Sequence, residues 1–272
     1  MGLGDDLLFL GKAEEIYKQT GKKITPLYGK GWSPLFENVE FLTKRGGLTV
    51  NARDTNKKSD VHVDYYEEKK ETTNKGKRIK WRKFTPTPFR VRLTEKEIHS
   101  AKSILNNENL EKFCIVNPDY KSSFFAHNKN WGFEKYQQLT NELSKVIKVV
   151  RILPGGDYTE PSLENAMNIK CENIRVSIAI MSMSSFGVSY DGLLQHVFAG
   201  FEIPCVVIQG GLVDQSVISY KTNIHHTYEH PLTPCGSMYD CSHCEEANKA
   251  ITVEHILHSC MRLINENDRI SS

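Results

Sequence analysis

The chain lacks any run of about 18 apolar residues, which is the length that a membrane-spanning helix requires. Its first residues, Met-Gly-Leu-Gly-Asp-Asp, have neither the basic flank of a signal peptide nor the Ser or Thr of a myristoylation site. We therefore expect no transmembrane segment and a cytoplasmic location. The net charge is only +2 over 272 residues, so charge indicates a partner only where it is locally concentrated.

Cysteine is also scarce, and the seven residues are an odd number that cannot all pair in disulfides. Three of them, Cys114, Cys171 and Cys205, lie in apolar, strand-like contexts in which reduced buried thiols are common. The sequence therefore does not indicate a disulfide framework.

The remaining cysteines gather toward the C-terminus with a spacing that suits a structural zinc site. These candidate ligands are Cys235, Cys241, Cys244 and Cys260, with His243, His255 or His258 as alternatives. A clean pair of Cys-x-x-Cys knuckles is absent, so thiols that simply pack in a core are the competing interpretation.

The length exceeds that of a usual single domain, and a composition of 39% hydrophobic and 25% charged residues is typical of a soluble protein. We expect two α/β lobes with a boundary near Asn107, comprising residues 1–106 and 107–272. In the first lobe, apolar spacing predicts a helix that ends at Gly21 and strands over 23–28 and 61–66. The capping box Thr94-x-x-Glu97 predicts a further helix that leads to the boundary.

The second lobe alternates predicted strands with predicted helices. We expect strands over 113–117, 149–153, 174–181 and 205–208, and helices over 133–146 and 253–264. Such alternation predicts a mainly parallel sheet.

Residues 69–92 contain ten Lys or Arg residues against one acid, with Trp81, Phe84 and Phe89 interleaved. Clustered cations with aromatic side chains suit phosphates and stacked bases, so this stretch is a candidate acceptor site for an anionic glycolipid or nucleic acid. Its candidate contacts are Lys77, Arg78, Lys80 and Arg82. A solvated loop is the competing interpretation.

Asp191 and Gly192 begin a predicted helix whose first turn carries His196, and this helix leads into a buried strand that ends in two glycines. The exposed amides and positive dipole end of such a helix suit a pyrophosphate, and the glycine allows close approach. The competing interpretation is a helix capped by Asp191, with His196 packed in an interface.

The loop after the predicted strand 113–117 offers hydroxyl groups at Ser122 and Ser123 and an ammonium group at Lys129, just before a helix. Open α/β sheets bind ligands outside the carboxyl ends of their strands, which is where this loop lies. Lys129 could neutralise a phosphate there, although a single lysine is more often a solvated surface residue.

Three separated blocks together resemble glycosyltransferase family 9, the heptosyltransferase family of two-lobed GT-B enzymes. The blocks are Gly2-Leu3-Gly4-Asp5-Asp6-Leu7, Lys129-Asn130-Trp131, and Asp191-Gly192 ahead of His196. Their order and separations agree with the family across most of the chain.

The resemblance implies two Rossmann-like lobes and an inverting sugar transfer from a nucleotide-diphosphate sugar to an acceptor hydroxyl. Such a reaction needs a base near the acceptor and positive or dipolar groups near the pyrophosphate. By this analogy the base is Asp5, with Asp6 as a substitute. The implied donor contacts are Lys129, Asp191, Gly192 and His196, with Ser122 and Ser123 as looser candidates. The resemblance calls for no catalytic metal, and Asp5 could alternatively be a helix N-cap.

The chain departs from the family pattern in its first lobe, which is shortened and has no strand ahead of the glycine turn. The acceptor is therefore left open between a lipopolysaccharide-like glycan and modified DNA. Two other classes of function also stay open, namely a non-catalytic nucleotide-sugar-binding protein and a zinc-stapled interaction module.

Overall fold

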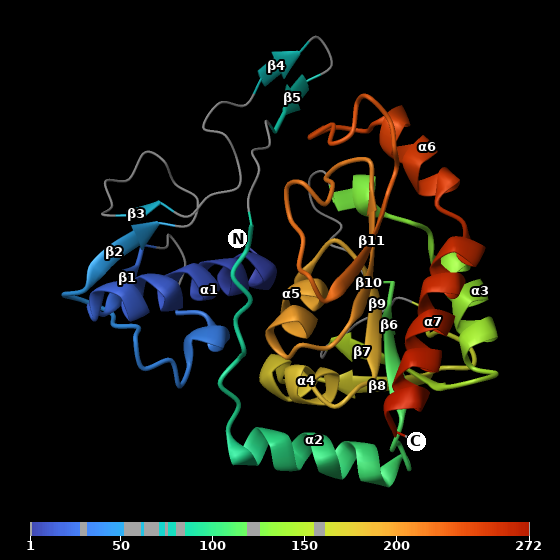
Figure 1. Cartoon of the computed structure of the whole chain (residues 1–272), viewed down its shortest axis with the longest axis horizontal. Helices are drawn as coiled ribbons and strands as arrows, with labels where there is room; N and C mark the ends of the chain where they lie inside the picture. Colours follow the sequence, from blue (N-terminus) through green and yellow to red (C-terminus); the bar gives the residue numbers. More distant parts are fainter. Residues whose placement is uncertain are drawn as a thin grey trace.

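The computed structural model describes residues 2–27, 32–51, 61–62, 71–73, 76–79, 85–118, 126–154 and 161–271. These residues form a mixed α/β protein, as predicted, in which a small N-terminal sheet lies beside a larger C-terminal sheet (Figure 1). None of the helices in these ranges combines the length and the apolar character that crossing a bilayer requires.

The larger sheet is parallel, with the strand order β11-β10-β9-β6-β7-β8. Its strands are β6 (Phe113–Asn117), β7 (Lys148–Pro154), β8 (Met167–Cys171), β9 (Phe186–Tyr190), β10 (Cys205–Gly210) and β11 (Asn223–Thr227). In this sheet, β7 and β8 follow β6 outward on one side. The last three strands, β9, β10 and β11, lie on the other side of β6 in that order. This order is that of a Rossmann-type doubly wound sheet and confirms the predicted parallel arrangement.

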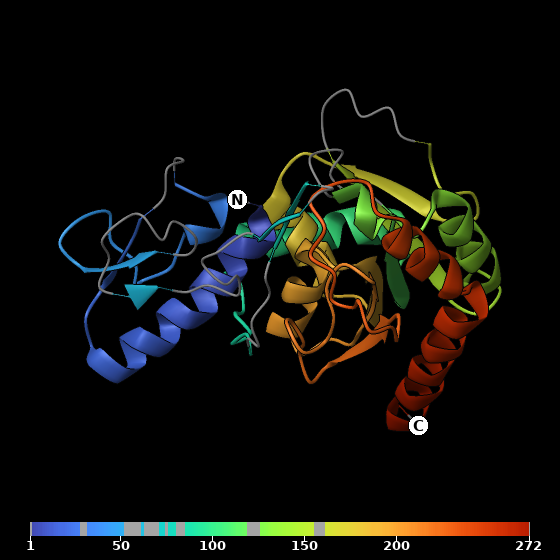
Figure 2. The same cartoon turned by 90° about the horizontal axis from the view of Figure 1, so that it is seen from above.

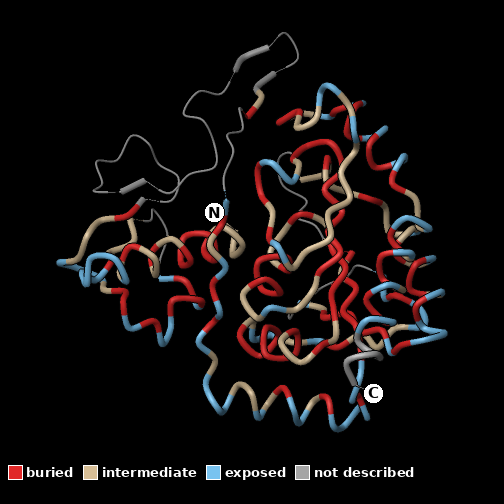
Figure 3. Tube along the Cα trace, viewed as in Figure 1, coloured by how far each residue is buried: buried red, intermediate tan, exposed pale blue. Residues whose placement is uncertain are grey.

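Successive side chains of the central strands pack into two different apolar cores, one on each face of the sheet. Ile115 packs with α4 (Ile174–Met181) and α5 (Leu193–Gly200). Its neighbours Cys114 and Val116 pack instead with α3 (Phe133–Leu143) and α7 (Val253–Ser271). Side chains along a strand alternate between the faces, and both faces are covered here. The central strands β6, β9 and β10 are therefore mostly apolar and almost entirely buried, whereas the edge strands β8 and β11 are more exposed (Figure 3).

The N-terminal lobe is built around the helix α1 (Leu3–Thr20), which ends at Gly21 as predicted. Beside it lies a small parallel sheet of β1 (Ile24–Pro26), β2 (Leu48–Asn51) and β3 (Val61–His62), with the short 3-10 helix η1 (Pro34–Phe36) (Figure 2). Leu10 of α1 and Ile24 of β1 belong to the same apolar core as Phe198 of α5 and Val207 of β10. The two lobes therefore share one continuous core.

The helix α2 (Glu95–Asn107) joins the lobes and starts at the predicted capping box, in which Thr94 and Glu97 exchange hydrogen bonds. It packs against α4 of the larger sheet. Arg175 of α4 is 2% exposed and donates to Glu97 Oε1 at 2.5 Å, to the Pro34 carbonyl at 3.1 Å and to the Arg92 carbonyl. This one guanidinium ties α4 to both the linker helix and the first lobe, and the boundary near Asn107 stays a prediction.

A small antiparallel hairpin of β4 (Glu71–Thr73) and β5 (Gly76–Arg78) occupies part of the basic stretch. Its second strand ends against the loop that precedes α6 (Ser242–Ala250). The Ile79 amide donates to the Gly236 carbonyl at 2.7 Å, and Arg78 forms an antiparallel bridge with Ser237. The basic stretch of the first lobe is thus paired with a loop of the second.

One predicted element is wrong. Residues Ile174–Met181 were expected to form a strand and form the helix α4 instead, with the Asn173 side chain accepting from the Arg175 amide at 2.9 Å. The first five residues, Ile174-Arg175-Val176-Ser177-Ile178, alternate apolar and polar as a strand would, and so short a segment does not separate a buried helix from a buried strand. The strands β8, β9 and β11 were not predicted at all, and of the predicted strands over 23–28 and 61–66, Tyr28 and residues 63–66 lie outside the described residues.

Candidate functional site

The candidate site lies where the strand order of the larger sheet reverses. The strands β6 and β9 are neighbours there, with Asn117 paired to Ser189 at their carboxyl ends. In open parallel sheets ligands bind outside the carboxyl ends of the strands at this switch point. The segments that follow β6 and β9 therefore supply the first groups that a ligand would meet.

Lys129 and Asp191 come from these two segments and form an ion pair. Lys129 ends the 3-10 helix η2 (Ala126–Lys129) after β6, and Asp191 follows β9 directly. The Lys129 Nζ atom lies 2.6 Å from Asp191 Oδ2 and 3.2 Å from the Asp191 carbonyl oxygen. Burial raises the pKa of Asp191, but the ammonium group of Lys129 outweighs burial, so the pKa lies below its ordinary value. The pair is therefore charged at neutral pH.

This contact argues against a solvated lysine at position 129 and against a helix cap at Asp191. The Lys129 side chain is only 19% exposed, so it is not a solvated surface lysine. Asp191 does not cap the following helix, because Gly192 is the N-cap of α5 and the Asp191 carboxylate is taken by Lys129 and by the Gln195 amide group. The glycine thus leaves the first turn of α5 without a capping side chain.

His196 is almost fully buried one turn into α5, and its Nδ1 lies 2.7 Å from the Tyr220 hydroxyl. Burial lowers the pKa of His196 to about 4, so the imidazole is neutral at pH 7. Gly4 of α1 lies directly against this ring, since a β-carbon added at Gly4 would be 3.0 Å from His196 Cδ2. The predicted glycine turn of the first lobe and the predicted donor helix of the second therefore meet.

The two candidate bases differ in their surroundings. Asp5 is half-buried, and its Oδ2 accepts a hydrogen bond from the Gly2 amide at 2.7 Å, so it also supports the start of α1. Asp6 is buried and accepts a hydrogen bond from the Ser33 hydroxyl at 2.7 Å. The charge of Asp5 acts on the pKa of His196, which places Asp5 near the site. Of the two, Asp5 is the more exposed.

Contacts at this site are described for only some of the predicted residues. Ser122, Ser123, Lys80 and Arg82 lie outside the described residues. Lys77 is described only as part of the β5 backbone, and Arg78 Nε donates to the Tyr239 hydroxyl at 3.3 Å. The hairpin therefore reaches the loop before α6, and among the described residues no hydrogen bond or ion pair joins it to Lys129 or Asp191.

Two further residues complete the polar cluster and were missed by the sequence analysis as site residues. Gln195 is fully buried beside Asp191, and its Oε1 has no hydrogen-bond partner among the described residues. Its position four residues after Asp191, on the same helix face, was an available signal. Tyr220 comes from a loop 24 residues beyond His196, and no local pattern marks it.

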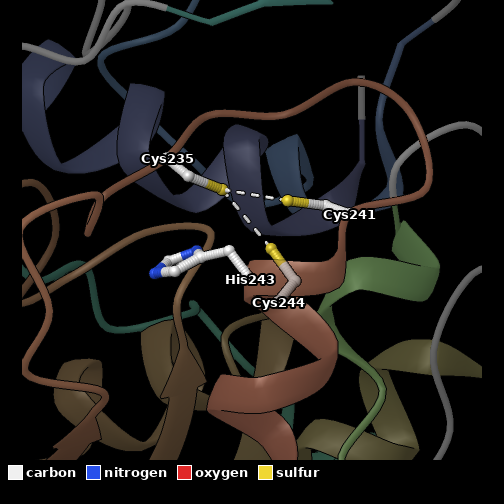
Figure 4. Close-up of side chains that lie close together, drawn as sticks. All are labelled: Cys235, Cys241, His243 and Cys244. Carbon is white, nitrogen blue, oxygen red and sulfur yellow. Dashed lines mark hydrogen bonds between the residues drawn. The ribbon is translucent and has the colours of Figure 1, made fainter. Parts of the chain in front are cut away.

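The cysteine cluster forms a second candidate centre (Figure 4). The ligand atoms of Cys235, Cys241, His243 and Cys244 all lie within 4.8 Å of one another, and all four residues are buried. Cys235 Sγ lies 3.4 Å from Cys244 Sγ and 4.0 Å from Cys241 Sγ, and none of these cysteines is in a disulfide. Hydrogen bonding from the Cys244 thiol holds the pKa of Cys235 well below that of an ordinary cysteine. This arrangement could hold a metal ion.

The structure corrects one predicted ligand. Cys260 of α7 is buried in the core between α7 and the sheet, together with Cys114, whereas the cysteine cluster forms a separate small core with Leu212. A helix that packs its apolar face on the sheet cannot turn the same face toward α6. His243 takes the fourth place, and the other two histidines considered, His255 and His258, are exposed.

A pocket of about 400 Å³ opens between η2 and α6. Asn128, Trp131, Cys241 and Asn248 are among its lining residues, whereas Lys129 and Asp191 are not. The pocket therefore lies beside the cysteine cluster rather than at the switch point of the sheet.

No family model and no curated protein matches the chain. Among solved structures, a glycosyl transferase family 9 protein from Veillonella parvula DSM 2008 aligns over 98% of this chain and 95% of its own, with 12% identity and a TM-score of 0.66. The E. coli ADP-heptose lps heptosyltransferase II aligns over 66% of this chain and 54% of its own, with 16% identity and a TM-score of 0.45. The iron-containing dodecameric glycosyltransferase TibC from enterotoxigenic E. coli H10407 aligns over 60% and 46%, with 14% identity and a TM-score of 0.45.

The chain thus spans about half the length of these two E. coli proteins and nearly all of the Veillonella protein. The alignment to the Veillonella protein includes both lobes, and it confirms the predicted fold class of a two-lobed α/β protein. Along almost its whole length, the chain has the fold of a glycosyl transferase family 9 protein.

Proposed function

We propose that the protein is an inverting glycosyltransferase whose donor is a nucleotide-diphosphate sugar. The observation that carries the proposal is the charged Lys129–Asp191 pair beside the uncapped start of α5, at the switch point of a Rossmann-type sheet. A fold likeness to a family 9 protein over both lobes supports the same reaction class. Fold alone does not determine function, so the chemistry of these groups must support the reaction.

The donor diphosphate would bind at the start of α5. Its backbone amides carry no capping side chain, and the helix dipole favours an anion there. Lys129, held by Asp191, would neutralise the charge that develops on the leaving diphosphate as the glycosidic bond breaks. Neutral His196 lies one turn further along and would contact the donor through hydrogen bonding rather than charge.

The acceptor would approach from the first lobe. Asp5 at the start of α1 would remove the proton from the acceptor hydroxyl as its oxygen attacks the anomeric carbon from the face opposite the diphosphate. A carboxylate accepts several hydrogen bonds, so the bond from the Gly2 amide is compatible with this role. The bond from the acceptor oxygen to the sugar forms while the bond to the diphosphate breaks, which inverts the anomeric centre.

The class of acceptor that we propose follows from the positive charge of residues 69–92. The basic stretch 69–92 belongs to the first lobe and suits an anionic acceptor, either a phosphorylated glycan or modified DNA. A cytoplasmic location agrees with the use of a nucleotide-sugar donor and remains part of the proposal.

Thermal unfolding with ADP, UDP, GDP, CMP and their sugar conjugates tests the donor site without an acceptor. A ligand that binds the folded state at about 100 times its Kd stabilises it by about 2.7 kcal/mol. We expect one nucleotide class to raise the unfolding temperature of the wild type, and Lys129→Ala to remove most of that shift. The matched control is Lys145→Ala, because the Lys145 side chain is 63% exposed and pairs with Glu142 three residues earlier in the sequence.

No shift with any of these ligands at millimolar concentration would overturn the proposed donor. An equal shift in Lys129→Ala and Lys145→Ala would instead place the nucleotide elsewhere on the molecule.

A non-catalytic nucleotide-sugar-binding protein is the second candidate. It is favoured by the use of the Asp5 carboxylate to hold the Gly2 amide, which is a structural role that needs no catalysis. Donor binding without hydrolysis or transfer, across a panel of anionic acceptors, would select this candidate over the enzyme.

A further inference from the structure

We propose that Cys235, Cys241, His243 and Cys244 hold one structural zinc ion, and that this ion clamps the basic hairpin of the first lobe and the Lys129 segment of the second to one loop. The metal site stands independently of the proposed transferase activity. Only the consequence for nucleotide binding depends on that activity.

The sulfur positions fit a tetrahedral ion. With zinc–sulfur bonds of about 2.3 Å, the sulfurs of a tetrahedral site lie about 3.8 Å apart. Cys235 Sγ lies 3.4 Å from Cys244 Sγ and 4.0 Å from Cys241 Sγ, and these two distances lie on either side of that value. Apolar packing alone does not explain why three thiols lie close to one another and to a histidine.

The histidine supplies the fourth ligand in the required tautomer. His243 Nε2 lies 3.1 Å from the Thr233 hydroxyl, whereas its Nδ1 is buried with no hydrogen-bond partner in the part of the chain that the structure describes. A metal-bound histidine characteristically donates its second ring N–H to an oxygen acceptor, which fixes the ring. A zinc ion at Nδ1 would satisfy the nitrogen that the protein leaves unpaired.

The site is closed, as structural zinc sites are. Three thiolates and one imidazole complete four-coordination and leave no open position for water or substrate. All four ligands are buried, and Cys244 is fully so. The ion would therefore hold structure rather than carry out chemistry.

The first element that the ion would fix is the hairpin β4–β5. The Cys235 and Gly236 amides donate to the Gly211 and Leu212 carbonyls at 3.0 Å and 3.1 Å, which holds the loop to the end of β10. The same loop accepts the Ile79 amide at Gly236, and its Tyr239 accepts from Arg78. The basic hairpin thus depends on a loop whose shape the metal would set.

The second element is η2, which carries Lys129. Asn128 is 3% exposed and donates through Nδ2 to the Ser237 carbonyl at 3.2 Å and the Tyr239 carbonyl at 2.9 Å. Asn248 of α6, the helix that carries His243 and Cys244, donates to the Asn128 carbonyl at 3.1 Å. The residue next to Lys129 is therefore held from two sides by the segment around the metal ligands.

Metal content is the first test. Purified wild-type protein should contain one zinc ion per chain, and X-ray absorption should show three sulfur neighbours at about 2.3 Å and one nitrogen at about 2.0 Å. Cys241→Ser should lose the ion, whereas Cys171→Ser, which removes a half-buried thiol outside the cluster, and Cys260→Ala should retain it. Iron at the same stoichiometry, a Cys235–Cys244 disulfide, or a metal-free protein that takes up no zinc would overturn the assignment.

Hydrogen exchange on the wild type tests the clamp without any variant that risks misfolding. After removal of zinc by a chelator, the amides around Ile79, Gly236 and Asn130 should exchange faster by about tenfold or more, and zinc should restore their protection. The amides of Ile115 and Val188 in the central strands serve as internal controls and should not change. Zinc loss with unchanged exchange at Ile79 and Asn130 would overturn the clamp even if nucleotide binding failed for another reason.

Discussion

His196 shows how strongly a single residue depends on its surroundings. Its polar side chain is almost fully buried between Tyr220 and the first turn of α1. The folded protein therefore binds a proton there far less readily than the unfolded chain does, since the pKa falls from 6.5 to about 4. Protonation of the unfolded chain then competes with folding.

The expected consequence is a loss of stability in weak acid. Between about pH 6.5 and pH 4 the unfolded chain binds the proton and the folded protein does not, so the free energy of unfolding falls as pH falls, by about 3 kcal/mol in all from this group. Denaturant unfolding at a series of pH values measures this slope.

His196→Gln should reduce the slope in that window, because glutamine does not titrate. Part of the slope should remain, because burial also lowers the pKa of His226 to about 4 and lowers the pKa of His225. Asp191 contributes with the same sign but at lower pH, since its pKa in the folded protein lies below that of an ordinary aspartate, which is itself below that of histidine. A slope between pH 6.5 and pH 4 that is identical in the variant and the wild type would show that His196 is not the group responsible.

At the scale of elements, the extended segment 85–94 is packed between α1 and α5. Gly11 of α1 lies against the Thr87 carbonyl and Gly200 of α5 against the Phe89 carbonyl, so closely that an added β-carbon would sit 1.9 Å and 2.1 Å from these oxygens. Both contacts are with backbone, which cannot rotate away. These glycines allow the segment to fit between the two helices.

Gly11→Ala should therefore destabilise the protein by about 1–3 kcal/mol through overpacking. Helix propensity alone predicts the opposite sign, a gain of about 1 kcal/mol, because alanine is the better helix former. Chemical denaturation of this variant distinguishes the two effects. Lys18→Ala in the exposed last turn of the same helix is the control and should change stability little; a stabilised Gly11→Ala protein would contradict the packing described.

At the scale of the whole molecule, the candidate base and the candidate donor groups come from different lobes. Asp5 is at the start of α1, whereas Lys129 and Asp191 follow strands of the larger sheet. The shared core and the buried Arg175 fix the lobes relative to each other. Chemistry and donor binding should therefore be separable by mutation.

Asp5→Asn should lower the rate of sugar transfer by about 10²–10⁴-fold, as expected for loss of a general base, while nucleotide affinity stays near that of the wild type. Steady-state kinetics together with calorimetric binding of the nucleotide measures the two effects. Asp6→Asn is the matched control, because an amide oxygen can still accept the bond from Ser33. If Asp6→Asn loses the greater part of the rate, the roles assigned to the two aspartates must be exchanged.

The sequence by itself determined the features that depend on neighbouring residues. The capping box at Thr94, the helix that ends at Gly21 and the helix that follows Gly192 all formed as predicted, because caps and glycine ends act within a few residues. The alternation of strands and helices likewise predicted the parallel sheet.

Only the tertiary structure decided the contacts between distant segments. Lys129 pairs with Asp191 across 62 residues because β6 and β9 are neighbours in the sheet. The local sequence around either residue does not predict that strand order. The same holds for the cysteine cluster, in which His243 rather than Cys260 joins the other ligands, since the direction each helix faces is set by the core that it covers. The short segment Ile174–Met181, mostly apolar but with Arg175 and Ser177, forms a helix that covers one face of the sheet. Its local pattern suits a buried strand as well as a buried helix, so the neighbouring elements decide between them.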